Sequence, residues 1–183
     1  MNSAGSQHKI VFSGPVGAGK TTAIAAISEK PPVSTEQRAT DETRHMKETT
    51  TVAMDYGSIR LPDNTLISLY GTPGQKRFDF MWNILSRGAI GLVLVIDHQA
   101  SDPLADLATY IQAFAETFHP HNTVIGVNKF SHDDGPSWQD YHQTLGVIGC
   151  PSPLLEIDAR DRSDVAMLIQ ALLFSIEPGL QSF

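Results

Sequence analysis

Short apolar runs alternate with longer amphipathic stretches along this chain. Five runs are apolar and rich in β-branched residues, and they cover residues 8–13, 65–71, 89–98, 122–129 and 153–158. Runs of this length and composition are typical of strands that are covered on both faces of a sheet. The pattern therefore predicts a largely parallel sheet inside the domain.

The stretches between these runs have the period of amphipathic helices. Apolar residues recur three and four positions apart over 104–118 and again over 165–176, which places them on one face of a helix. A further helix is expected over 21–30, and Asp102 before Pro103 is a typical helix start. Alternating strands and helices predict an α/β fold in three layers, αβα, with helices on both faces of the sheet.

Three polar segments interrupt the alternation. Leu61–Thr65 contains Pro, Asp and Asn and predicts a hairpin turn, so one edge strand is expected to be antiparallel. Pro31–Thr51 is longer than most connections, and Thr72–Lys76 is short and rich in Gly and Pro. Because segments of this kind often carry function, we expect both to rearrange when a ligand binds.

The composition indicates one ordinary globular domain over residues 1–183, with a flexible N-terminus over 1–7. The net charge of −7 argues against duplex nucleic acid or an anionic membrane as a partner, so any anion site must be local. The single cysteine, Cys150, points to a reducing compartment, and no apolar run has bilayer length or resembles a signal peptide. These features predict a cytoplasmic protein without a direct membrane anchor.

One motif carries the clearest chemistry. Residues 14–21 read GPVGAGKT and fit the phosphate-loop pattern G-x-x-x-x-G-K-[ST], between a predicted strand and a predicted helix. Glycines let backbone N–H groups approach phosphate closely, and the helix adds its positive end. Lys20 would reach the outer phosphates, and Thr21 would offer its hydroxyl to Mg²⁺. The predicted nucleotide contacts of this loop are Gly14, Val16, Gly17, Ala18, Gly19, Lys20, Thr21 and Thr22.

Two further stretches carry a family resemblance. Gly71–Phe78 reads GTPGQKRF at the end of a predicted strand, and Thr49–Gly57 reads TTTVAMDYG upstream of it. They resemble the switch segments of the Ras-like superfamily of small GTPases, whose strand ends in Asp-Thr-Ala-Gly-Gln-Glu-Arg-Phe. More narrowly, the chain over about residues 8–174 resembles the bacterial small GTPases related to the gliding-motility protein MglA, which work with roadblock-fold partners. The resemblance implies the P-loop NTPase fold, with a mainly parallel six-stranded sheet and one antiparallel edge strand.

The resemblance also implies catalytic roles. Gln75 would orient the attacking water, and Lys20 would stabilise the charge that develops on the phosphates. The N–H of Gly74 would bind the γ-phosphate, so that both switch segments order around the triphosphate and relax after hydrolysis. The Mg²⁺ ligands that the resemblance implies are Thr21 and Thr51, with Thr49 and Thr50 as alternatives to Thr51.

The chain departs from this pattern beside the metal. Position 71 is Gly, where small GTPases have an aspartate that holds Mg²⁺ through water. The missing carboxylate predicts weaker Mg²⁺ binding, slow intrinsic hydrolysis and reliance on a partner. Asp97, which ends a predicted strand, is the expected substitute, and Asp55 ranks behind it.

The base-reading motif is altered as well. NKFS, at residues 128–131, stands where the resembled family has Asn-Lys-x-Asp. That aspartate accepts two hydrogen bonds from guanine, whereas Ser131 accepts one, so we expect a weakened preference for guanine. At Asp158–Arg160 the amide of Ala159 would meet the base oxygen, and Arg160 would pack over the ring. The implied base contacts are Asn128, Lys129, Ser131, Asp158, Ala159 and Arg160.

Together these features predict a GTP/GDP switch that uses Mg²⁺ and hydrolyses GTP slowly, with help from a partner. The expected partners are regulatory and effector proteins, among them a roadblock-fold activator. A tryptophan such as Trp82 more often packs in the core, but it is also a candidate for the surface that binds these partners. Arg44 is a candidate for charge stabilisation in cis. Two alternatives stay open: a nucleotide-binding interaction module that has lost hydrolysis, and an adenine-nucleotide enzyme of the P-loop class.

Overall fold

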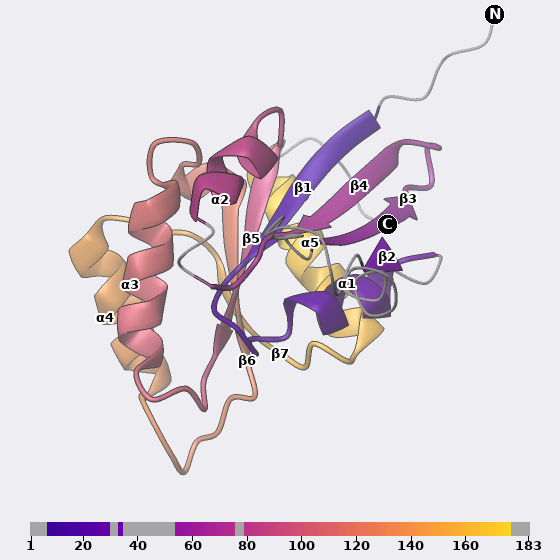
Figure 1. Cartoon of the computed structure of the whole chain (residues 1–183). Helices are drawn as coiled ribbons and strands as arrows, with labels where there is room; N and C mark the ends of the chain where they lie inside the picture. Colours follow the sequence, from indigo (N-terminus) through magenta and orange to yellow (C-terminus); the bar gives the residue numbers. More distant parts are fainter. Residues whose placement is uncertain (1–6, 30–32, 35–53, 76–78, 177–183) are drawn as a thin grey trace, which may run out of the picture.

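A seven-stranded sheet forms the middle layer of the protein, whose computed structural model describes residues 7–29, 33–34, 54–75 and 79–176 (Figure 1). Its strands are β1 (Gln7–Ser13), β2 (Val33–Ser34), β3 (Asp55–Arg60), β4 (Leu66–Gly71), β5 (Gly91–Asp97), β6 (Thr123–Asn128) and β7 (Leu154–Ile157). They lie in the order β2-β3-β4-β1-β5-β6-β7. All neighbouring pairs from β4 to β7 are parallel, whereas β3 runs antiparallel to both of its neighbours.

The predicted fold class, a three-layer α/β fold of the P-loop type, is confirmed. Six strands form the expected mainly parallel sheet with one antiparallel strand, β3. The two-residue β2 adds a seventh strand outside β3, so the antiparallel strand is not the outermost one. The predicted turn over 61–65 joins β3 to β4 as a hairpin, in which Asn64 takes the left-handed conformation with φ 72°.

Helices cover both faces of this sheet. They are α1 (Lys20–Ile27), α2 (Asp79–Ser86), α3 (Pro103–Phe114), α4 (Trp138–Ile148) and α5 (Arg162–Ile176), and a short 3₁₀ helix, η3 (Pro120–Asn122), precedes β6. α1 and α5 pack on one face, and α2, α3 and α4 pack on the other (Figure 1). The two apolar stripes predicted over 104–118 and 165–176 lie on α3 and α5 and face the sheet.

Local capping explains where two of these helices begin. The Asp102 carboxylate accepts a hydrogen bond from the N–H of Ala105 at 3.0 Å, as predicted for the start of α3. At the start of α4, the Ser137 hydroxyl accepts from the N–H of Asp140, and Gly149 ends the helix with φ 75°. The sequence pattern gives no prediction for α4, because only two of its side chains are fully buried.

Two apolar clusters hold the helices on the sheet, one under α1 and α5 and the other under α2, α3 and α4. Trp82 belongs to the second cluster: it is 4% exposed, and its ring stacks on Phe114 with the centroids 5.4 Å apart. Of the two roles predicted for Trp82, the structure therefore shows packing and not a partner-binding surface. Its large ring is used to fill the layer between α2 and α3.

The loops after the parallel strands meet at one edge of the sheet, because parallel strands all end on the same side. β1 lies in the middle, with β4 on one side and β5 on the other. In α/β proteins, the crevice at such a reversal of strand order is where ligands bind. The loops over 14–19, 72–75, 129–137 and 158–161 therefore frame the candidate site.

Some predictions fall outside the described residues. These are residues 1–6 of the flexible N-terminus, Thr49 to Thr51 with the candidate metal ligand, most of the segment Pro31–Thr51 and Arg44. Gln7, which the prediction placed in that N-terminus, is the first residue of β1. Among the helices of the described residues, none is long and apolar enough to cross a membrane.

The core packing predicts a large effect for one side chain of α5. Leu168 is fully buried against Gly126 of β6, so Leu168→Ala leaves a cavity and should lower the free energy of unfolding by about 2–5 kcal/mol. The neighbouring Met167 is 47% exposed, and Met167→Ala should change that value by less than about 0.5 kcal/mol. Urea denaturation of both variants measures the difference, and equal losses would contradict the packing described here.

Candidate functional site

The loop between β1 and α1 follows a path that only glycine allows at two positions. Gly14 has φ 140°, and a side chain there would collide with the carbonyl oxygen of Val95 on β5. Gly19 has φ 107°, and a Cβ would lie 2.6 Å from Nδ2 of Asn128 on β6. The loop therefore rests directly on the ends of two strands. Of its other predicted contacts, Ala18 is buried, and Val16, Gly17, Thr21 and Thr22 are exposed.

Lys20 begins α1 and points back into this loop. Its Nζ donates hydrogen bonds to the carbonyl oxygens of Gly14 and Pro15, at 2.7 and 2.6 Å, and the side chain is 7% exposed. Burial lowers the pKa of Lys20 to about 8, although nearby Asp55 acts in the opposite direction. A bound polyphosphate would stabilise the charged ammonium and raise this pKa again.

Gly74 lies against the same loop. A Cβ at position 74 would lie 2.6 Å from the backbone nitrogen of Val16 and 2.9 Å from Nζ of Lys20. The structure therefore brings Gly74 and Lys20 together, at the place where the phosphate-loop motif predicts the outer phosphates. Gln75 follows in the chain and is exposed.

Two buried aromatic side chains fix the backbone around Gly74. Trp82 Nε1 donates to the Pro73 carbonyl at 3.0 Å, and the Tyr110 hydroxyl donates to the Gly74 carbonyl at 2.8 Å. Burial raises the pKa of Tyr110 to about 12, so this hydroxyl keeps its proton. The peptide between Pro73 and Gly74 is trans, so the Gly74 N–H points away from the indole that holds the Pro73 carbonyl.

The structure places the two candidate aspartates in different parts of the site. Asp97 forms an ion pair with Lys129, at 2.6 Å between Oδ2 and Nζ, and its other oxygen accepts the N–H of Gln99. Asp55, on β3, accepts a hydrogen bond from the hydroxyl of Thr21. The carboxylate beside the predicted metal ligand of the phosphate loop is therefore Asp55, because the β3–β4 hairpin brings it there.

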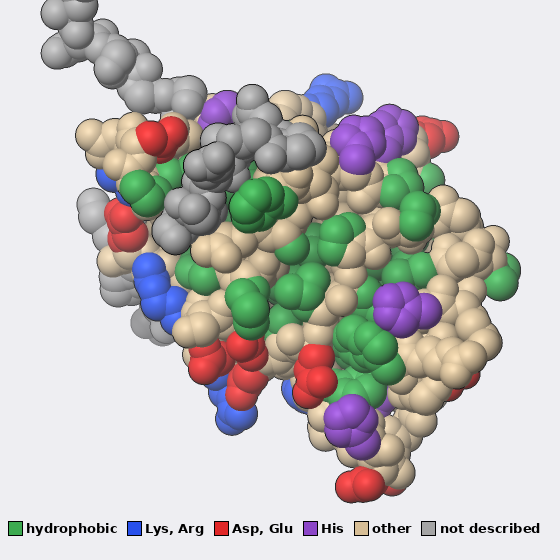
Figure 2. Space-filling view, turned by 180° about the vertical axis from the view of Figure 1, so that it is seen from behind, with side chains coloured by type: hydrophobic (Ala, Val, Ile, Leu, Met, Phe, Trp, Pro, Cys, Tyr) green, Lys and Arg blue, Asp and Glu red, His purple; other side chains and the backbone are tan. Residues whose placement is uncertain are grey.

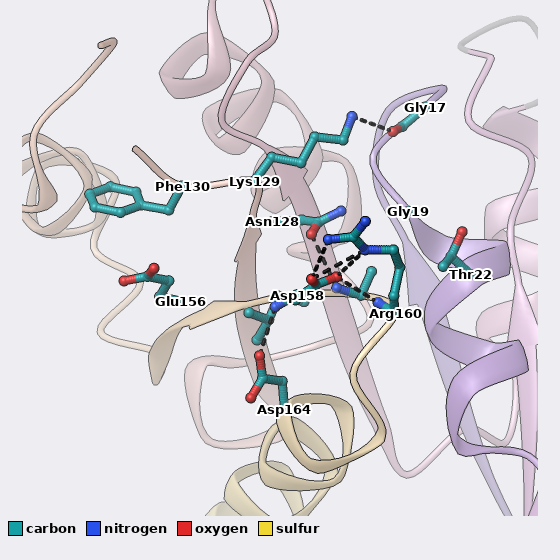
Figure 3. A pocket seen from close by; sticks show the side chains of 12 residues that line it. Gly17, Gly19, Thr22, Asn128, Lys129, Phe130, Glu156, Asp158, Arg160 and Asp164 are labelled. Carbon is teal, nitrogen blue, oxygen red and sulfur yellow. Dashed lines mark hydrogen bonds and ion pairs between the residues drawn. The ribbon is translucent and has the colours of Figure 1, made fainter. Parts of the chain in front are cut away.

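A cavity of about 740 Å³ opens beside the phosphate loop, between the ends of β6 and β7 (Figure 3). Phe130 and Glu156 lie on one side of it and Thr22 on the other (Figure 3). The space-filling view shows acidic side chains gathered at the lower end of the molecule, with basic ones beside them (Figure 2). The cavity beside the phosphate loop is lined by Gly17, Gly19, Thr22, Asn128, Lys129, Phe130, Glu156, Ile157, Asp158, Ala159, Arg160 and Asp164.

Asn128 joins three parts of this pocket. Its Nδ2 donates to the carbonyl of Ala18 at 2.9 Å, and its Oδ1 accepts the N–H of Ala159 at 3.1 Å. Lys129 follows in the left-handed conformation with φ 59°, and its Nζ lies 3.4 Å from the carbonyl of Gly17. The aliphatic stem of Lys129 therefore crosses from β6 to the phosphate loop along one wall of the pocket.

Asp158 and Arg160 form the opposite wall. The Arg160 guanidinium donates to the Asp158 carboxylate, with a shortest distance of 2.6 Å, and this lowers the pKa of Asp158 to about 2. Asp164 accepts the N–H of Asp158 at 2.8 Å. Both carboxylates therefore have partners within the protein. Ala159 and Arg160 also line the pocket, and their contacts with a base stay predictions.

The structure adds residues to the pocket and moves one away. Ser131 is not part of the lining, and its hydroxyl accepts the N–H of Asp133 at 3.2 Å. Phe130, Glu156 and Asp164 line the pocket without having been predicted. Glu156 lies on β7, where it pairs with Val127 of β6, and its side chain is exposed. Within the described residues, this side chain has no hydrogen bond or ion pair. A signal for it exists in the sequence, because a charged residue inside an apolar strand run is unusual.

Comparison with known proteins gives two findings. A family model described as conserved hypothetical ATP binding protein matches residues 30–145, which is more than half of the chain. Over 47 residues the chain is 45% identical to the uncharacterized protein MJ1339 of Methanocaldococcus jannaschii, and the match covers 26% of this chain and 30% of that protein. The chain therefore spans less than a third of this relative, and the family description indicates nucleotide binding.

These findings correct the family resemblance given by the motifs. The assignment to Ras-like small GTPases, and to the group related to MglA, is wrong, because the matching model describes ATP binding proteins. A phosphate loop and a Gly-Gln segment after a strand both serve to bind a triphosphate. Proteins of different families use such sites, so the two motifs do not identify the family. The roadblock-fold activator rests on that resemblance alone and stays a prediction.

The buried ammonium predicts a proton uptake that accompanies nucleotide binding. Because the pKa of Lys20 is about 8 in the free protein and phosphate favours the charged form, binding at pH 8 should take up about half a proton. The uptake should be small at pH 7 and grow toward one proton at pH 9, while affinity falls as the pH rises above 8. Calorimetry in two buffers of different ionisation enthalpy measures it, and a flat profile from pH 7 to 9 would contradict this assignment.

Proposed function

We propose that this chain, which belongs to the family described as conserved hypothetical ATP binding proteins, hydrolyses a purine nucleoside triphosphate slowly and acts as a switch. The observation that carries the proposal is the position of Gly74 against the phosphate loop, next to Lys20. The terminal phosphate of a triphosphate would lie beside Lys20, in the space that Gly74 borders. A triphosphate and a diphosphate therefore differ in their contact with Gly74, which is the requirement for a switch.

The groups for hydrolysis are supplied by neighbouring elements. The Lys20 ammonium would hold the outer phosphates, and the Gly74 N–H would bind the terminal one. Gln75, exposed beside Gly74, would orient the attacking water in line with the leaving oxygen. The Thr21 hydroxyl and the Asp55 carboxylate are oxygen donors of the kind that Mg²⁺ prefers, and bound Mg²⁺ would neutralise charge on the phosphates.

We expect slow hydrolysis because the arginine that lines the pocket is already paired. The Arg160 guanidinium is bound to the Asp158 carboxylate, so it is not free to stabilise charge at the phosphates. A regulatory protein that inserts a cation, or that fixes Gln75, would therefore raise the rate, in the way that arginine fingers act on other nucleotidases.

We propose that the pocket prefers guanine to adenine. Guanine presents two donors side by side, N1–H and the N2 amino group, which suit a carboxylate, whereas adenine presents an acceptor at N1. Glu156 is the pocket carboxylate without a partner among the described residues, since Asp158 and Asp164 are both engaged. Asn128 and Lys129 form the other wall. We therefore propose GTP and GDP as the ligands, with Glu156 taking the place of the aspartate that the sequence has lost at position 131.

The family description favours a second candidate, an ATP-dependent switch built on the same phosphate site. The phosphate loop, Gly74 and Gln75 would act in the same way, and only the base would differ. The choice between the two is a matter of base contacts, so it is made by direct competition between GDP and ADP.

Competition against a fluorescent nucleotide tests the base preference. GDP should displace it at least about tenfold more effectively than ADP, and Glu156→Gln should weaken GDP by about tenfold while changing ADP much less. Glu116→Gln is the matched control, because it makes the same chemical change on an exposed residue outside the pocket. If ADP competes equally well or better, the guanine proposal fails and the ATP-dependent switch replaces it.

Single-turnover hydrolysis tests the role of Gln75. Gln75→Leu should slow phosphate release by at least about tenfold, because water is no longer oriented, while nucleotide affinity stays within about twofold. Gln99→Leu, at an exposed turn after β5, is the matched control and should leave both values unchanged. If the wild-type protein binds nucleotide and never cleaves it, the chain is an interaction module without hydrolysis.

A further inference from the structure

We infer that Asp55, on the antiparallel strand β3, supplies the carboxylate of the Mg²⁺ site, in place of a residue at the end of β4. The inference rests on the proposed function, since it concerns the metal that accompanies the nucleotide. It assigns a metal-site residue outside the phosphate loop and outside the segment that follows β4.

The pairing of β3 with β4 places Asp55 there. Asp55 is the first residue of β3 and pairs directly with Gly71, the last residue of β4. Residues opposite each other in an antiparallel pair project to the same face of the sheet. A carboxylate at position 55 or at position 71 would therefore reach the same part of the site. In this chain the carboxylate is at position 55, on β3.

The absence of a side chain at Gly71 leaves room for this arrangement. A Cβ at position 71 would lie 3.0 Å from Cβ of Asp55 and 3.1 Å from its Oδ2. The Asp55 carboxylate thus occupies the volume that a side chain at position 71 would need. A side chain at position 71 would therefore crowd Asp55, which would have to shift by a few tenths of an ångström.

The contacts of Asp55 connect it to the phosphate loop. Its Oδ2 accepts a hydrogen bond from the hydroxyl of Thr21, the residue after Lys20. Asp55 is half-exposed and Thr21 exposed, which leaves access for an ion that keeps part of its water shell.

Asp97 does not offer the same chemistry. Its Oδ2 is 2.6 Å from the Lys129 ammonium, and its Oδ1 accepts the N–H of Gln99. Both oxygens are engaged on the base side of the site. If Asp97 bound the metal, the Lys129 ammonium would lose its ion pair. Asp55 would lose only its hydrogen bond from the Thr21 hydroxyl, and that hydroxyl is itself a predicted metal ligand.

The test follows the Mg²⁺ dependence of nucleotide release. The protein is loaded with a fluorescent GDP or ADP, whichever binds, and dissociation is measured across a range of free Mg²⁺ set with EDTA. Asp55→Asn should shift the Mg²⁺ midpoint upward by about 10- to 100-fold, while affinity without Mg²⁺ is kept or slightly increased. Asp97→Asn, the matched control, should leave the midpoint within about threefold.

A charge swap separates a metal role from a structural one. The double variant Asp55→Gly with Gly71→Asp moves the carboxylate across the strand pair and should restore the midpoint that Asp55→Gly alone loses. Retained nucleotide binding without Mg²⁺ shows that each variant is folded. A mere packing role for Asp55 would give no restoration by the swap.

The possible failures are distinguishable. If wild-type protein retains nucleotide with a clear Mg²⁺ dependence and Asp55→Asn does not shift it, or if Asp97→Asn shifts it instead, the inference is overturned and the proposed function stands. If nucleotide binds without any Mg²⁺ dependence, the inference is overturned in the same way. If no purine nucleotide binds, the proposed function and the inference fall together.

Discussion

The buried amide of Asn128 is the interaction on which the rest of the site depends. One side chain donates to the phosphate loop at Ala18 and accepts from the loop after β7 at Ala159. It is 5% exposed, so neither hydrogen bond competes with bulk water. Gly19 must lack a side chain to let Asn128 approach. The distance between the phosphate end and the base end of the site is therefore set by the core, and not by mobile loops.

This rigid frame carries a positive site on a negative protein. The chain has a net charge of −7, and the pocket lining itself includes Glu156, Asp158 and Asp164. Attraction for polyphosphate must come from a few groups at short range: Lys20, the start of α1 and the N–H groups of the loop. Because Lys20 is buried among carbonyl groups, its charge costs free energy until an anion arrives. Burial thus makes the site selective for ligands that bring several negative charges at once.

Sequence reasoning reached the fold and the phosphate loop because both are local. The runs of β1, β4, β5 and β6 show their strands directly, and GPVGAGKT carries its own chemistry in eight consecutive residues. It ranked Asp97 above Asp55 because the contact of Asp55 depends on strand register, which places residues 55 and 71 side by side. Strand assembly also explains why the place of Glu156 in the pocket lining escaped prediction, since the pocket is built at the ends of three strands. The family followed from a comparison of the chain and not from two short motifs, which unrelated nucleotidases share.

The indole of Trp82 connects the segment beside the phosphate loop to the interior of the protein. Its ring stacks inside the α2–α3 layer, while its N–H holds the Pro73 carbonyl, one residue before Gly74. A displacement of the backbone at Pro73 would therefore change the surroundings of a buried fluorophore. The other tryptophan, Trp138, lies at the start of α4 and faces Phe130 of the base pocket. The phosphate end and the base end of the proposed site therefore each have a tryptophan close by, which would act as an intrinsic optical reporter without any added label.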